Sequence, residues 1–172
     1  MSEGRFDAPA IVLTLYRHDV RFVLIGGLAA QLWGSPTSTQ DLDICYSRDK
    51  LNLEQLAAAL GELNAKLRGV KEKVLFRLDA RTLAAGDSFT FTTDLGDLDC
   101  LGTPTGTNGY EDLKQAAEPM NVGGIEILVT SLDDLIRMKR AAGRPKDRIE
   151  VEVLGAVREE RARRKPRGQR QV

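Results

Sequence analysis

Asp41 and Asp43, which flank a single apolar residue, are the two side chains of this sequence with the clearest potential for chemistry. They open the run Asp41–Tyr46, which is otherwise mostly apolar and is predicted to be a strand. Because alternate residues of a strand point to the same face, both carboxylates are expected to project together. Carboxylates held this close repel each other unless a cation lies between them. The pair therefore predicts a divalent metal site.

Glycines precede this strand at two places. The apolar run 22–25 predicts a buried strand that ends at Gly26-Gly27, and a short apolar helix is expected next. Gly34 and Ser35 then open a loop rich in small polar residues, of the kind that binds phosphate. Each motif alone is common in proteins without such a site, since Asp-x-Asp often lies in a turn and Gly-Gly can serve close packing. Their combination at this spacing is what predicts metal and nucleotide binding.

A third carboxylate is available from a later hairpin. The alternation in 88–93 and 97–101 predicts two antiparallel strands joined at a turn. Asp97 and Asp99 lie on one face of the second strand, so periodicity alone does not choose between them. Mg²⁺ prefers carboxylate, water and phosphate oxygens, and two ions about 4 Å apart can hold the attacking and leaving oxygens of a phosphoryl displacement.

The remaining pattern predicts the elements that position these residues. Apolar residues at helical spacing, with caps and helix-ending glycines and prolines, predict helices over 8–20, 52–68, 110–118, 132–142 and 145–165. Asn52 and Ser131 are the expected N-caps of the second and fourth. Further strands are expected at 74–78 and in a hairpin over 122–129. This order predicts an α/β (α+β) fold with a mixed sheet flanked by helices and a helical C-terminal part.

Composition sets the broad class. The 172 residues have no formal net charge and no apolar run long enough to span a bilayer, so we expect a cytoplasmic protein without a membrane partner. One domain is expected over 1–165, with a disordered basic tail at 166–172. From Arg137 onward Lys and Arg strongly outnumber Asp and Glu, which is compatible with a nucleic-acid partner. Cys45 and Cys100 lie in apolar strands and are expected to be buried thiols.

Taken together, these motifs resemble the signature of the DNA polymerase β-like nucleotidyltransferase superfamily. The resemblance lies in Ile25-Gly26-Gly27, in Gly34-Ser35 and in Asp41-Leu42-Asp43-Ile44. Within that superfamily the chain is similar to small bacterial AbiEii-type toxin nucleotidyltransferases, through 135–140 and 144–147. The loop before Asp41 departs from the pattern, because it lacks the Arg that relatives often carry there.

The resemblance implies transfer of a nucleoside monophosphate from an NTP to an acceptor hydroxyl, with Mg²⁺, or alternatively Mn²⁺, as the cofactor. Asp41 and Asp43 would bind two metal ions, with Asp99 as third carboxylate and general base and Asp97 as its alternative. Nucleotide binding would fall to Gly26, Gly34, Ser35, Lys139, Lys146 and Asp147. For Lys139, an interaction with the helix dipole and the last carbonyls of its helix is an equally plain interpretation. Lys146 and Asp147 could equally be solvated residues in the first turn of the helix that follows Pro145.

Three functions remain open at the level of sequence. The first is a toxin that modifies RNA such as tRNA and is opposed by an antitoxin protein. The second is a nucleotidyltransferase whose acceptor is a small molecule or a protein hydroxyl. The third is a catalytically silent module that binds nucleotide or a partner and keeps the fold.

Overall fold

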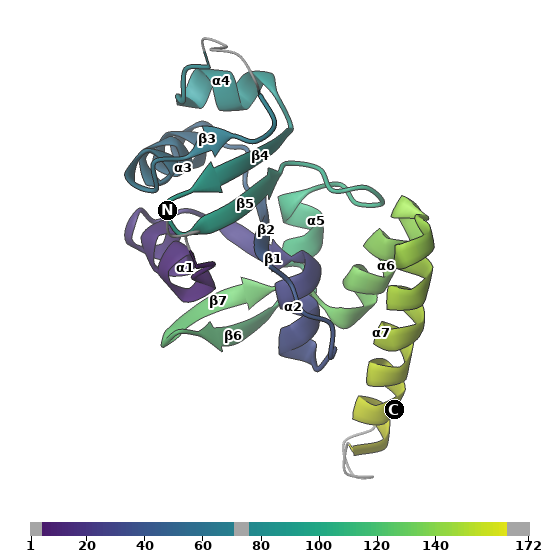
Figure 1. Cartoon of the computed structure of the whole chain (residues 1–172). Helices are drawn as coiled ribbons and strands as arrows, with labels where there is room; N and C mark the ends of the chain where they lie inside the picture. The colour runs from purple at the N-terminus through teal and green to yellow at the C-terminus, as the bar shows by residue number, and fades with distance from the viewer. Residues whose placement is uncertain (1–4, 71–75, 165–172) are drawn as a thin grey trace.

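The computed structural model of the protein describes residues 5–70 and 76–164, and its centre is a seven-stranded mixed sheet (Figure 1). The strand order is β3-β4-β5-β2-β1-β7-β6. The β2/β5 and β1/β7 pairs are parallel, and the other neighbours are antiparallel. The mixed sheet predicted from the sequence is therefore confirmed. The strands are β1 (Phe22–Ile25), β2 (Asp41–Tyr46), β3 (Lys66–Leu67), β4 (Ser88–Thr93), β5 (Gly96–Leu101), β6 (Glu118–Val122) and β7 (Ile125–Val129).

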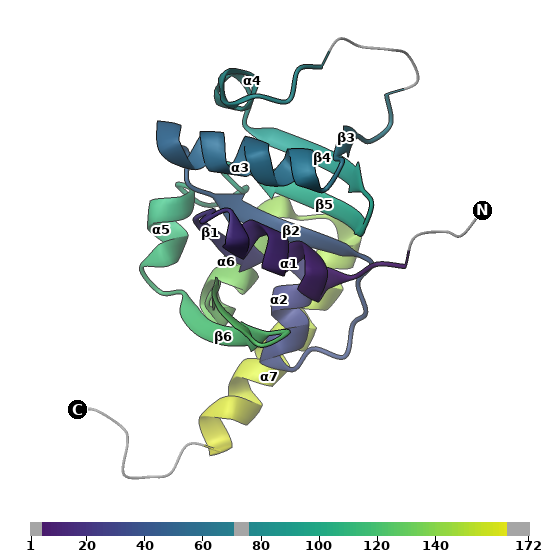
Figure 2. The same ribbon diagram turned by 90° about the vertical axis from the view of Figure 1, so that its left-hand side faces the viewer.

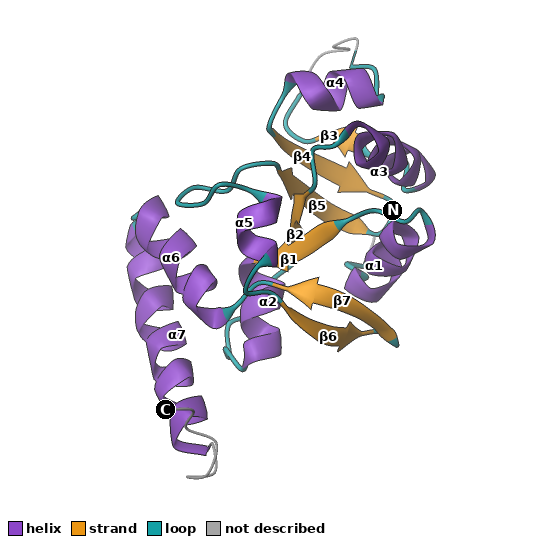
Figure 3. Cartoon of the chain, turned by 180° about the vertical axis from the view of Figure 1, so that it is seen from behind, coloured by secondary structure: helices purple, strands orange, loops and turns teal. Residues whose placement is uncertain are grey.

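Helices cover both faces of this sheet. Helices α1 and α3 lie side by side over one face (Figure 2), while α5, α6 and α7 lie on the other side of the sheet (Figures 1 and 3). Helix α6 packs against the N-terminal part of α7, whose C-terminal part extends beyond it. The helices are α1 (Ala8–Arg17), α2 (Gly26–Trp33), α3 (Lys50–Glu62), α4 (Ala80–Ala85), α5 (Tyr110–Lys114), α6 (Leu132–Ala142) and α7 (Pro145–Arg164). Among the described helices, none is long and apolar enough to cross a membrane.

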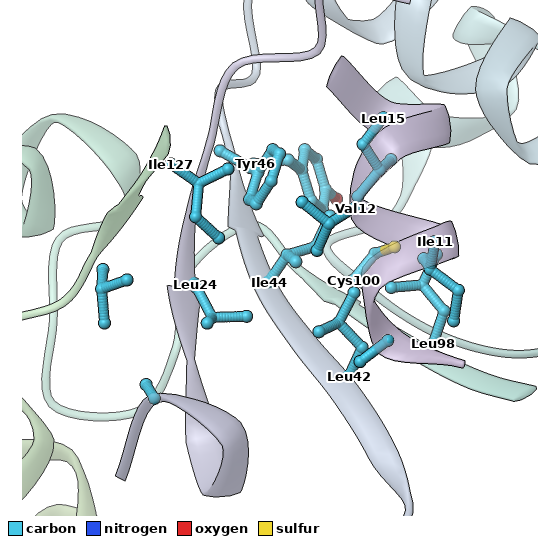
Figure 4. Close-up of a cluster of buried hydrophobic side chains, with 14 of the residues drawn as sticks. Ile11, Val12, Leu15, Leu24, Leu42, Ile44, Tyr46, Leu98, Cys100 and Ile127 are labelled. Atoms are coloured by element: carbon cyan, nitrogen blue, oxygen red, sulfur yellow. The ribbon is translucent and has the colours of Figure 1, made fainter. Parts of the chain in front are cut away.

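The alternation in β2 decides which side chains are buried under α1. Leu42, Ile44 and Tyr46 are fully buried and belong to the main core, to which α1 contributes its apolar face (Figure 4). Asp41 and Asp43 consequently point to the opposite face. A slip of one residue in this strand would place both carboxylates in the apolar core, so the core fixes where they project.

Several sequence predictions are confirmed residue by residue. Helix α6 begins after Ser131, whose Oγ accepts the N–H of Asp134 at 3.1 Å, and it ends at Gly143, which adopts the left-handed conformation. Both cysteines are buried free thiols, and burial raises the pKa of Cys45 to about 12.

The helix predicted over 52–68 is wrong at both ends. Asp49 is the N-cap and accepts the N–H of Asn52 at 2.9 Å. The Asn52 side chain is buried and bonds instead to the backbone of Arg21 and Ser47, where it ties α3 to the ends of β1 and β2. The helix stops at Glu62, because Asn64 has a positive φ of 52° and turns the chain into β3.

Two other boundaries also differ. The helix expected over 110–118 ends at Lys114, because Glu118 already pairs with Val129 in the β6–β7 hairpin. The strand expected over 74–78 is absent at 76–78, and 71–75 lie outside the described residues. The basic tail predicted for 166–172 also lies outside them.

Candidate active site: a carboxylate cleft beneath the last two helices

Parallel pairing of β2 with β5 brings the predicted carboxylates together. The register sets Asp41 beside Asp97 and Asp43 beside Asp99. Asp41, Asp43 and Asp99 each place one carboxylate oxygen within 4.8 Å of the others, and among the described residues this is the group able to hold a metal ion. Asp97 lies on the same face, but its side chain is 40% exposed and its nearest charged partner is Arg68. Of the two candidates that periodicity left open, the structure brings Asp99 into the cluster.

The electrostatics of this cluster favour a bound cation. Burial, together with the negative charges of Asp41 and Asp99, raises the pKa of Asp43 to about 7, while the nearby Lys139 ammonium opposes this rise. Ionisation of all three carboxylates is therefore electrostatically unfavourable in the protein without metal, and a bound divalent cation would offset the repulsion. A set of three closely spaced carboxylate oxygens is also the donor chemistry that Mg²⁺ and Mn²⁺ prefer. The residues present fit the metal that the resemblance implies.

Gly26 allows β1 and α2 to approach the cluster closely. It has a positive φ of 72°, and a Cβ built on it would collide with the carboxylate of Asp43. Gly27 is similarly close to Thr39, whose Oγ1 donates to Asp41 Oδ1 at 2.7 Å. The two glycines therefore place the start of α2 against both strand carboxylates. Because the N-cap residue Ile25 supplies no side-chain cap, the first N–H groups of α2 lie next to the cluster without an internal acceptor.

Replacing Gly26 by Ala should abolish any reaction at this cleft and lower the stability of the protein by roughly 1–3 kcal/mol. The added methyl group meets Asp43, and the positive φ strains any L-residue. Gly61→Ala in α3 is the matched control, because no atom lies within 4 Å of its Cβ position and alanine favours a helix. Chemical denaturation and a metal titration of both variants will test this. Wild-type stability in Gly26→Ala would contradict the close approach.

Two cations from α6 and the turn before α7 form the opposite wall of the cleft. The cleft has a volume of about 300 Å³, and its lining includes Asp43, Asp99, Lys139 and Arg144. Behind the two cations lies Asp147, which is completely buried. Asp147 accepts the Arg144 Nε–H at 2.7 Å and Nη2–H at 3.2 Å, and lies 3.5 Å from Lys139 Nζ. The Arg144 guanidinium is the main reason that the pKa of Asp147 lies below its usual range.

The structure brings together some of the residues predicted to bind nucleotide and leaves others apart. Gly26 and Lys139 line the cleft, and Asp147 lies behind its wall. Lys146 is exposed to solvent outside the cleft lining. Gly34 and Ser35 lie at the far end of α2, where their N–H groups donate to Gln31 and Ala30 of the last helical turn. These amides are thus already engaged by the helix end.

Two arginines at the site had no role in the sequence interpretation. Arg144 directly follows Gly143, the glycine that ends α6. Its closeness to Lys139 around this turn could have indicated from the sequence that Arg144 belongs to the site. Arg68 lies directly after β3, and its Nη2–H donates to Asp99 Oδ1 at 2.6 Å. Nothing in the sequence pattern relates Arg68 to Asp99, because β4 lies between their strands and β3 has only two residues. Together the two residues supply cations that the loop before Asp41 lacks.

Comparisons with known proteins show a similar fold in solved structures but no significant sequence match. No protein-family model matches the sequence, and no curated protein matches it significantly. The lincosamide antibiotic adenylyltransferase LnuA, solved with lincomycin bound, is 13% identical with a TM-score of 0.58 and covers 89% of this chain and 99% of its own. A Thermotoga maritima protein described as a nucleotidyltransferase is 17% identical with a TM-score of 0.52, covering 95% and 100%. ANT(2")-Ia, solved with adenylyl-2"-tobramycin, is 15% identical with a TM-score of 0.53, covering 89% and 91%. The chain therefore has the fold of these nucleotidyltransferases.

Proposed function

We propose that the protein is a metal-dependent nucleotidyltransferase, which moves a nucleoside monophosphate from an NTP to an acceptor hydroxyl and releases pyrophosphate. The observation that carries this proposal is the convergence of Asp41, Asp43 and Asp99 within 4.8 Å, in a cleft whose other wall presents Lys139 and Arg144. Carboxylates suited to a divalent ion face cations suited to a triphosphate across one cleft. The fold shared with known nucleotidyltransferases supports the same reaction class.

Each wall of the cleft has a separate task in this proposal. Asp41, Asp43 and Asp99 would hold the divalent ions, Mg²⁺ or Mn²⁺, which neutralise phosphate charge when bound. Lys139 and Arg144 would bind the β- and γ-phosphates and stabilise the charge that develops on the departing pyrophosphate. The free N–H groups at the start of α2 provide a second anion-binding element beside Asp43.

The proposed reaction is an in-line displacement at the α-phosphorus. The acceptor oxygen forms a bond to that phosphorus while the bond to the bridging oxygen of the β-phosphate breaks. Asp99, at the edge of the cluster, takes the proton of the acceptor hydroxyl, and the bond electrons leave with pyrophosphate. Asp97, beside it on β5, is the alternative proton acceptor and is more exposed, with 40% of its side chain accessible.

RNA, for example tRNA, is the acceptor we put forward first. A hollow of about 340 Å³ adjoins the cleft through Lys139, and Arg140 and Arg148 also line it. Although Glu152 also lines this hollow, cations outnumber carboxylates there, so a phosphodiester chain could follow it to the reacting atoms. A toxin role and an antitoxin partner depend on this acceptor and stay predictions.

A small-molecule acceptor is the second candidate, because two of the similar structures contain antibiotics or an adenylylated antibiotic. In this case the cationic hollow would contribute nothing to binding. Charge reversal of Arg140 and Arg148 would then leave activity unchanged, whereas it would weaken RNA modification strongly. The pair of substitutions thus separates the two acceptors.

Incubation with each NTP labelled at the α-phosphate tests the function directly. With Mg²⁺ or Mn²⁺ we expect label to pass to one acceptor from a panel of total tRNA, tobramycin, lincomycin and the protein itself. Asp41→Asn with Asp43→Asn should lose the transfer, whereas Asp133→Asn, an exposed α6 carboxylate outside the cleft, should keep it. Label that persists in the double variant would refute the mechanism. Nucleotide binding without label transfer to any acceptor would favour the silent module.

A further inference from the structure

Arg68 reaches the carboxylate cluster from outside the elements that form it. Its side chain extends from the end of β3 past β4, donates to the carbonyl oxygen of Phe91 at 3.0 Å, and ends at β5. There Nη2–H donates to Asp99 Oδ1 at 2.6 Å. Nε lies 3.5 Å from Asp97 Oδ2, is buried, and has no hydrogen-bond partner among the described residues. The guanidinium therefore makes one strong ion pair to Asp99 and one longer contact to Asp97.

Among the residues that the structure describes, Arg68 is the direct ionic partner of the third carboxylate. Lys139 and Arg144 are on the opposite wall, and both contact Asp147. The side chain of Asp99 is only 18% exposed, so water compensates its charge poorly. Without a cation, three carboxylates within 4.8 Å repel each other. Arg68 offsets part of that repulsion through its ion pair with Asp99.

We propose that Arg68 is the resident counterion of the carboxylate cluster in the metal-free protein, and that it competes with the divalent ion for Asp99. The inference rests on the metal site of the proposed function. Since the Oδ1 lone pairs and the negative charge of Asp99 are shared with Arg68, a metal ion held by Asp99 would bind against the positive charge of the guanidinium. Arg68 would thereby offset the charge of the cluster when no metal is bound, and would weaken the affinity of the cleft for free metal.

The consequence concerns the order in which ligands bind. A divalent ion that binds alone is repelled by the Arg68 guanidinium and competes with it for Asp99. A metal–nucleotide complex also gains contacts to Lys139 and Arg144 across the cleft. The protein should therefore acquire metal mainly together with the nucleotide. Arg68 acts here as a positioning residue through Asp99 and does not itself need to touch the substrate.

Arg68→Gln tests the competition through Mn²⁺ binding, measured by isothermal titration or electron paramagnetic resonance in the full chain without nucleotide. We expect the variant to bind Mn²⁺ about tenfold more tightly, which is the order of effect of removing one nearby positive charge from a divalent ion site in high dielectric. Arg158→Gln is the control, because its pair with Asp133 is exposed and lies outside the cleft. It should leave the affinity unchanged.

A second readout does not depend on metal. In EDTA, Arg68→Gln should lower Tm in the wild-type background and have a smaller effect in Asp99→Asn, since the pair is then already broken. Equal effects in both backgrounds, or Mn²⁺ affinity that is unchanged or weaker in Arg68→Gln, would overturn the counterion role alone. If wild type and variant both fail to bind Mn²⁺ even when a non-hydrolysable NTP analogue is added, the metal site of the proposed function is refuted as well.

Discussion

Replacing Asp43 by Asn will abolish nucleotidyl transfer and, in the absence of metal, will make the protein more stable. The loss of activity should be about a thousandfold or more, because charge stabilisation dominates phosphoryl transfer. The gain in stability follows from the position of Asp43, which is half-buried beside two other carboxylates and has a pKa raised to about 7. A neutral amide of the same shape avoids that cost. Opposite effects on activity and stability are the signature of a carboxylate that is retained for function.

The stabilisation by Asp43→Asn should depend on pH in a defined direction. Burial raises the folded-state pKa from 3.8 to about 7, so between these values the folded protein holds a proton that the unfolded chain has lost. Stability from this group is full below pH 4 and is lost as the pH rises through 7. In EDTA we therefore expect wild type and variant to be similar at pH 4, with the difference growing between pH 4 and pH 7. At pH 8 the variant should be more stable than wild type by roughly 1–2 kcal/mol. This value is smaller than the free energy that corresponds to the whole pKa shift, because Asp43 is partly accessible to water.

Urea denaturation in EDTA at the two pH values measures this difference. Asp133→Asn serves as the control, because Asp133 is 75% exposed and pairs only with Arg158 at the surface. Its stability difference from wild type should be small at both pH values. A variant at Asp43 that is less stable than wild type at pH 8 would show that the carboxylate has a structural task in the bare protein.

Much of the cleft could be predicted from the sequence because its main residues lie within single elements. The alternation in β2 is local, and it places Asp41 and Asp43 on one face whatever the rest of the fold does. The alternation of β5 could not identify the third carboxylate, because Asp97 and Asp99 lie on the same face of that strand. Only the register of β5 on β2, which the whole sheet determines, sets Asp99 beside Asp43.

The residues that sequence reasoning misplaced depend on tertiary contacts. Asn52 is a residue type that often caps helices, yet its side chain is buried. Its Nδ2 donates instead to the backbone carbonyl oxygens of Arg21 and Ser47, next to the ends of β1 and β2. Gly34 and Ser35 have the composition of a phosphate loop, but the end of α2 uses their amides. Arg68 reaches Asp99 across a neighbouring strand, and no periodicity reports such a contact. Local composition shows what a segment can do, and the surrounding fold selects among those uses.

Replacing Asp147 by Ala will destabilise the protein strongly, lowering the free energy of unfolding by about 3 kcal/mol. Asp147 is fully buried, and it accepts the backbone N–H, Nε–H and Nη2–H of Arg144 as well as contacting Lys139. Its removal leaves the Lys139 ammonium, whose side chain is 23% exposed, without its partner. The pKa of Asp147 lies below the usual value because of Arg144, so its contribution is present at neutral pH and is lost only as the pH falls through that lowered value.

If the proposed reaction takes place in the cleft, the same contacts predict an influence of Asp147 on it without a contact to substrate. By holding Lys139 and Arg144 it orients the cationic wall toward the carboxylates 41, 43 and 99. Asp147→Asn keeps the shape but loses the charge, so we expect it to fold, to raise the KM for the NTP about tenfold or more, and to change kcat less. Arg144→Ala should raise the KM similarly and should also lower stability, because it leaves the buried Asp147 carboxylate with the backbone N–H of residue 144 and the more distant Lys139. Equal KM values in wild type and Asp147→Asn would mean that the wall is held by the α6–α7 packing alone. Asp147 would then contribute to the stability of the protein and not to the positioning of Lys139 and Arg144.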